Sequence, residues 1–159
     1  MSMHMHKDDL AKLMKLNWFT REKAKLITHE KVILTVEPYW ERGPLGGLIG
    51  AKLYFCMREQ FGTERVGIET WHIVQMAKWF FDIFKNSTDS IEKLICHELA
   101  HIAVPEEHNE DFRTYARFLG AAEFTEGEVH HIRSDNIWLV RLLLALGRGD
   151  VLIPKRLRK

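Results

Sequence analysis

Three residues within a five-residue stretch have the types and spacing needed to bind and use a metal ion. His97 and His101 are four positions apart, so on a helix they lie on one face, about 5–6 Å apart at Cβ, and can share one ion. Glu98 lies about 100° further around such a helix, where its carboxylate can take a proton from a water molecule beside the metal. With 9 histidines in 159 residues, this HExxH spacing would arise by chance about 0.05 times. The pattern therefore predicts a metal site with its own general base.

The sequence around the motif predicts the helix that these residues need. Asp89 followed by Glu92 resembles a capping box, which predicts that the helix begins near Ser90. Pro105 ends the helix, because a residue that precedes proline is disfavoured in the α conformation. Apolar residues recur at helical spacing and predict a buried face: Ile91, Leu94, Ile95 and Ile102.

A catalytic zinc commonly has three protein ligands and leaves its fourth position open. His108 is the leading third ligand, because Pro105 ends the helix after His101 and allows the chain to turn back. Other side chains further along the chain remain alternatives for this position: Glu123, Glu126, Glu128, His130 and His131.

The chain before the motif predicts a small sheet. Lys31–Glu37 is rich in β-branched residues and is followed by Pro38, as expected of a strand and its end. Residues 51–58 and 65–72 each alternate apolar with polar positions, and their short link predicts a hairpin-like connection. Strands followed by helices predict an α+β fold, with a small antiparallel or mixed sheet before the HExxH helix and a helical C-terminal half.

Helical periodicity and capping residues predict several helices besides the motif helix. In the first of them, Leu10 and Met14 share one apolar face. Thr20 is expected to cap the second helix, Asn109 to cap the fourth, and Gly120 to end the fourth. The expected ranges are 8–18, 20–28, 76–84, 109–120 and 136–146.

Composition limits the classes of protein to which the chain can belong. Its 159 residues are 46% hydrophobic and suffice for one domain, to which we assign residues 1–150, with residues 151–159 as a basic tail. A formal charge of +1 argues against a globally basic nucleic-acid binder. Two cysteines are too few for a disulfide scaffold or a four-cysteine zinc site. Without a signal peptide or a run of about 20 apolar residues, we expect a soluble, cytoplasmic protein with no membrane contact.

The stretch LICHELAH at residues 94–101, followed by HNEDF at residues 108–112, resembles the SprT-like metallopeptidases. That family has an HELxH helix, a short loop, a third histidine, and an aromatic residue four positions later, which is the place of Phe112. Many members also carry a C-terminal zinc ribbon, which has no counterpart in this sequence.

This resemblance implies a zincin-like domain that hydrolyses peptide bonds. The zinc ligands that it implies are His97, His101 and His108. Glu98 would be the general base toward the water that attacks the peptide carbonyl. The resemblance also implies that a protein or peptide substrate binds as an extra strand along a sheet edge, which we expect within residues 65–74.

The basic tail suggests a second kind of partner. Several SprT-like proteins act on DNA-associated proteins, so the tail is a candidate contact for nucleic-acid phosphates, in the nucleus or at the nucleoid. The tail's basic residues are Lys155, Arg156, Arg158 and Lys159.

The sequence does not identify the side chain that would stabilise the oxyanion, and it allows functions other than proteolysis. A side chain that stabilises the oxyanion is expected, and the sequence offers several without choosing: Tyr54, Tyr115, Arg117, His130 and His131. The chain could also be a catalytically idle binding or structural module, such as a phage or viral component, in which zinc only stabilises the fold. A non-proteolytic metallohydrolase would use the same ligands.

Overall fold

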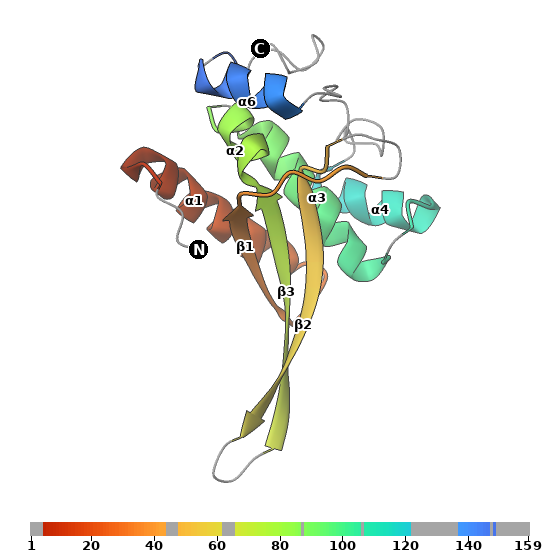
Figure 1. The fold of residues 1–159 in the computed structure, drawn as a ribbon. Helices are drawn as coiled ribbons and strands as arrows, with labels where there is room; N and C mark the ends of the chain where they lie inside the picture. Colours follow the sequence, from red (N-terminus) through yellow and green to blue (C-terminus); the bar gives the residue numbers. More distant parts are fainter. Residues whose placement is uncertain are drawn as a thin grey trace.

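The computed structural model describes residues 5–43, 48–61, 66–86, 88–105, 107–121, 137–146 and 148, with residues 58–61, 66–67 and 137–140 described in backbone only. Along the chain come helix α1 (Lys7–Ala24), strands β1 (Lys31–Glu37), β2 (Ala51–Phe61) and β3 (Val66–Ala77), and helices α2 (Lys78–Phe84), α3 (Asp89–Ala103), α4 (Glu110–Leu119) and α6 (Ile137–Ala145) (Figure 1). This mixed α+β architecture agrees with the predicted fold class. Within the described ranges, the helices are too short or too polar to span a bilayer.

The sheet has three strands in the order β1-β3-β2. β1 runs parallel to β3 and pairs with its residues 71–77, whereas β2 is antiparallel to β3 and pairs with it along its whole length. The outer part of the β2–β3 hairpin therefore extends beyond β1 and protrudes from the body of the molecule (Figure 1). The expectation of a sheet edge within residues 65–74 holds only in part. Residues 71–74 of β3 are paired on both sides, whereas residues 66–70 are paired with β2 alone, and β2 occupies an edge along its length.

One face of the sheet carries the core. Every second residue of β1 is buried, namely Val32, Leu34 and Val36. Their neighbours Val74 and Met76 on β3 are fully buried on the same face. Helices α1 and α3 cover this face (Figure 1), and α3 contributes a buried side of its own: Ile91, Leu94, Ile95, Cys96, Leu99 and Ala100. The motif helix is thus fixed on the sheet by apolar burial.

Helix α1 differs from the prediction in two ways. It is one helix rather than two, and the Thr20 hydroxyl donates to the Leu16 carbonyl at 2.7 Å within the helix instead of capping a new one. Its buried residues are Leu16, Thr20 and Ala24, whereas Leu10 and Met14 are exposed. The face that packs on the sheet is therefore not the one that the first apolar residues suggest.

The turn from α3 to α4 follows the predicted signals closely. α3 ends at Ala103, two residues before Pro105, and α4 begins at Glu110. The Asn109 side chain accepts a hydrogen bond from the Phe112 N–H at 2.9 Å, as expected of an N-cap. Gly120 ends α4 in the left-handed conformation, with φ of 107°. At the other end of α3, the predicted capping box is wrong, because Asp89 is the first helical residue and forms an ion pair with Lys93.

Asn17 of α1 protects the outer edge of β1. Its side-chain amide donates to the Leu34 carbonyl at 2.9 Å, and its Oδ1 lies 3.3 Å from the Leu34 N–H, which donates to it. One side chain thus binds both polar backbone groups that a neighbouring strand would otherwise bind.

We therefore expect Asn17→Ala to lower the free energy of unfolding by about 1–3 kcal/mol, because two backbone groups of Leu34 lose their partner. Urea denaturation of the purified chain measures this loss. Asn86→Ala is the control, since Asn86 is exposed and its side chain accepts a hydrogen bond from the exposed end of the Lys12 side chain. An equally small change in both variants would contradict this role for Asn17.

Candidate metal centre

Helix α3 presents His97 and His101 on one face. They are four residues apart, and their ring centroids lie 5.2 Å apart. His97 is 4% exposed, and His101 is half-buried. Because α3 packs on the sheet along its apolar side, this histidine face lies at the rim of the core.

His108 joins the pair from the turn between α3 and α4. Its Nε2 atom lies 3.3 Å from Nε2 of His97. Its ring centroid is 5.2 Å from that of His97 and 4.8 Å from that of His101. One ligand nitrogen from each of the three rings can be chosen so that all lie within 4.8 Å of one another. The structure thus brings together the three residues that the sequence singled out, as a group that could hold a metal ion.

One pair of donor atoms has the spacing expected in a tetrahedral site. With metal–nitrogen bonds of about 2.0–2.1 Å, two ligands of a tetrahedral zinc are roughly 3.3 Å apart, and the His97 and His108 nitrogens lie at this spacing. The His101 Nδ1–H donates to the Val104 carbonyl at 3.1 Å. Because a carbonyl can only accept, this bond favours the tautomer with its proton on Nδ1, which is the form in which Nε2 can bind a metal.

Phe112 packs against all three histidines. Its ring lies 4.5 Å from His101 and nearly parallel to it, and it meets His97 and His108 edge-on at 4.9 and 4.8 Å between centroids. Phe112 is 3% exposed and sits one turn into α4. The same turn of α4 that Asn109 caps therefore supplies the surface on which the three imidazoles rest.

A buried thiol further links the two helices. The Sγ of Cys96 donates to the Leu119 carbonyl at 3.1 Å, and burial raises the pKa of this thiol to about 11. Cys96 is therefore a packing residue rather than a metal ligand.

Glu98 lies beside the histidines and is 8% exposed. Burial raises the pKa of its carboxyl to about 8, because a charged carboxylate loses hydration in this environment. A divalent cation held by the adjacent imidazoles would favour the ionised form. Glu98 is therefore suited to exchange a proton near neutral pH.

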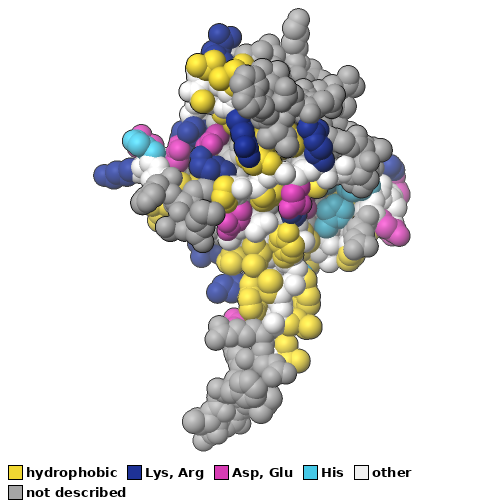
Figure 2. Space-filling view, in the orientation of Figure 1, with side chains coloured by type: hydrophobic (Ala, Val, Ile, Leu, Met, Phe, Trp, Pro, Cys, Tyr) yellow, Lys and Arg dark blue, Asp and Glu magenta, His cyan; other side chains and the backbone are white. Residues whose placement is uncertain are grey.

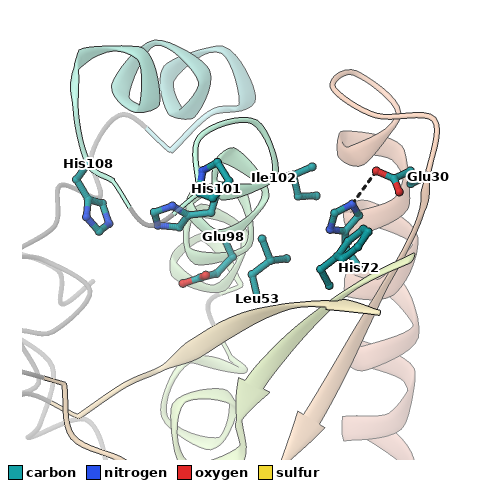
Figure 3. Close-up of a pocket in the computed structure, with 9 residues that line it drawn as sticks. Glu30, Leu53, His72, Glu98, His101, Ile102 and His108 are labelled. Carbon is teal, nitrogen blue, oxygen red and sulfur yellow. Dashed lines mark hydrogen bonds and ion pairs between the residues drawn. The ribbon is translucent and has the colours of Figure 1, made fainter. Parts of the chain in front are cut away.

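Glu98, His101 and His108 line a cavity of about 630 Å³ between α3 and the sheet, whereas the buried His97 is not part of the lining. Figure 3 shows Glu98, His101 and His108 at one end, Glu30 and His72 at the other, and Leu53 and Ile102 between them. Phe55 and Pro105 complete the lining. Sequence reasoning missed Glu30 and His72 as site residues. The sequence did contain one signal for His72. In the predicted strand 65–72, this histidine lies on the side of the strand that otherwise carries apolar residues.

Other sequence candidates take no part in this described cavity. Tyr54, Tyr115 and Arg117 do not line it, and Arg117 forms an ion pair with Glu110 on the surface of α4. Several candidates lie outside the described residues, together with the basic tail at 151–159: Glu123, Glu126, Glu128, His130 and His131.

We expect Phe112→Leu to weaken zinc binding by about tenfold or more, because the histidine rings lose the flat surface that orients them. Competition with a chromophoric chelator measures the affinity. Phe118→Leu is the matched control on the same helix, since Phe118 is 61% exposed. Wild-type affinity in the Phe112 variant, or an equal loss in both variants, would contradict an orienting role for Phe112.

Comparisons of the chain with models of protein families, with curated proteins and with solved structures found no match. The likeness to the SprT-like metallopeptidases therefore depends on the motif residues alone.

Proposed function

We propose that this chain is a zinc-dependent endopeptidase of the SprT-like kind, built on a zincin-like domain. The observation that carries the proposal is the convergence of His97, His101 and His108 beside Glu98, at one end of a cavity large enough for part of a polypeptide. A general base beside a three-nitrogen ligand set, open toward a cavity, is the arrangement that metal-assisted hydrolysis requires.

Zinc is the metal we propose for the three histidines. Imidazole nitrogens suit zinc, and three protein ligands with an open fourth position are typical of its catalytic sites. When bound, zinc would supply Lewis acidity that favours deprotonation of water and polarises the scissile carbonyl. His101 would be held for this role by its hydrogen bond to Val104.

Glu98 is the proposed general base. Its carboxylate would accept a proton from the attacking water and later pass that proton to the leaving amine. Burial raises the pKa of this carboxyl to about 8, and the positive charge of the bound zinc would favour the ionised form that can accept the proton. The Glu98 side chain itself lines the cavity.

The substrate we propose is an extended polypeptide that lies along β2. This strand pairs with β3 on one side, and Leu53 and Phe55 of β2 line the cavity. An edge strand can bind an extended peptide through backbone hydrogen bonds. Residues 71–76 of β3 are paired on both sides, so we propose β2, rather than residues 65–74, as the strand that binds the substrate.

DNA-associated proteins are the substrates that the SprT-like resemblance favours. The basic residues proposed to contact nucleic acid lie in the tail, beyond the described residues: Lys155, Arg156, Arg158 and Lys159.

A specific observation favours a binding module as a second candidate function. The β2–β3 hairpin exposes Phe55, Met57 and Ile68, and Figure 2 shows hydrophobic side chains gathered along this protruding part of the molecule. Large exposed apolar side chains that cluster in this way are typical of protein-binding surfaces. In this second candidate, zinc would stabilise the fold without turnover.

Glu98→Gln separates the two functions. We expect the variant to keep one zinc per chain and to lose hydrolysis of casein and unfolded polypeptides by about 10²-fold or more, because it keeps the shape of the side chain but removes the base. Quenched-fluorescence protease assays, with and without DNA, measure the loss.

Glu92→Gln on the same helix is the control, and it should retain wild-type activity. Equal hydrolysis by wild-type chain and Glu98→Gln, purified in the same way, would contradict the mechanism. Zinc binding without hydrolysis in the wild type would favour the binding module.

A further inference from the structure

The cavity has two chemically different ends. His101, His108 and Glu98 line the end next to the proposed metal centre, and the end formed by Glu30 and His72 has no part in the proposed hydrolysis. In Figure 3, Leu53 and Ile102 lie between the two ends. The Glu30–His72 end is therefore placed to contact a part of the substrate away from the bond that is cut.

Glu30 is held in place from three sides. Its backbone N–H donates to the Thr28 hydroxyl at 3.0 Å in the turn between α1 and β1. The His72 Nε2–H donates to its Oε1 at 3.1 Å. Interactions of its carboxylate with Thr70 and His72 lower the pKa of Glu30 below its usual value. The carboxylate is thus oriented by residues of the central strand, and it stays charged.

His72 is a structural support for this carboxylate. Its side chain is 8% exposed, compared with 37% for Glu30, and the Phe55 ring packs against it at 5.1 Å between centroids. Its Nδ1 is buried without a hydrogen-bond partner among the described residues. The Glu30 carboxylate is therefore the more accessible of the two groups.

The charge of Glu30 has no permanent counter-charge in the cavity. None of the described residues that line the cavity is a lysine or an arginine. The walls that lead to Glu30 are apolar, with Leu53 and Ile102 in the middle. A long apolar stem with a cationic end is the shape and charge that complement such a site, because the stem buries apolar surface and the end reaches the carboxylate.

We propose that the Glu30–His72 end of the cavity is a specificity subsite that binds the side chain of a lysine or arginine in the substrate. The stem of that side chain would lie against Leu53 and Ile102, and its head group would donate hydrogen bonds to Glu30. An acidic side chain at the same position would be rejected by like charge. This inference rests on the proposed peptidase function, because the site is assigned to a peptide substrate.

Peptide binding to the zinc-loaded Glu98→Gln chain tests the subsite without turnover. The probes are fluorescein-labelled peptides of one fixed sequence, with lysine, arginine, norleucine or glutamate placed at each position in turn. At one position, we expect lysine and arginine to bind about tenfold more tightly than norleucine, the range expected for a hydrogen bond between charged groups. Fluorescence anisotropy gives the dissociation constants.

Variants of Glu30 in the same background assign the preference. Glu30→Gln should bring the lysine and norleucine peptides to within about twofold, since the charge is lost. Glu30→Asp keeps the charge and should keep the preference. Glu22→Gln is the matched control, because Glu22 is a partly exposed carboxylate (44%) on α1 that pairs with Lys25. Thermal melts of each variant show that it is folded.

Three outcomes would overturn the subsite: equal affinity for lysine and norleucine peptides at every position, a basic preference that persists in Glu30→Gln, or no binding by any peptide. Hydrolysis of the same peptides by wild-type chain separates this failure from failure of the proposed function. Hydrolysis without a preference for basic residues would contradict the proposed subsite and support the proposed peptidase function. If the chain binds basic peptides preferentially, in a way that depends on Glu30, but does not hydrolyse them, the subsite would be supported and the peptidase function contradicted.

Discussion

The structure depends on the packing of α4 back against α3, in which the Phe112 ring contacts all three imidazoles from one side. This contact brings His108 to within 3.3 Å of His97 across a turn of the chain. Its supports are the end of α3 before Pro105, the Asn109 cap, and the Cys96 hydrogen bond to the end of α4. Because none of these supports is a histidine, the candidate metal centre is organised by packing and capping before any ion binds.

The sheet positions the two carboxylates of the cavity, Glu98 and Glu30. Burial of α3 on β3 and β2 places Glu98 in an environment of low polarity, which raises its pKa, and leaves the cavity between helix and sheet. The same sheet orients Glu30 through Thr70 and His72. One carboxyl with a raised pKa and one with a lowered pKa thus share a single cavity. This difference fits a proton-transfer role for Glu98 and a charge-recognition role for Glu30.

Capping residues and strand composition correctly predicted individual helices and strands. They did not predict how elements far apart in the sequence are arranged. The bounds of β1 and the cap and end of α4 follow from β-branched residues, Asn109 and Gly120, which act on their own backbone. The HExxH spacing and the helix-ending Pro105 were enough to nominate the three histidines that the structure brings together. Strand order was not predictable from such local signals, because it depends on pairing between distant segments. In the structure β3 lies between β1 and β2, so β2 is an edge strand. Glu30 and His72 were not predicted as site residues, because they are 42 residues apart and come together only when the turn before β1 packs beside β3.

If three histidines hold one catalytic zinc ion, as we propose, the number of zinc ions bound per chain must depend on each of them. Elemental mass spectrometry would be applied to wild-type chain, His108→Ala and the control His29→Ala, an exposed histidine on the turn before β1, after loosely bound ions are removed. We expect one zinc per chain in the wild type and in His29→Ala, and a sharp loss in His108→Ala. One zinc retained in His108→Ala would move the third ligand elsewhere, and no zinc in the wild type would contradict the metal centre itself.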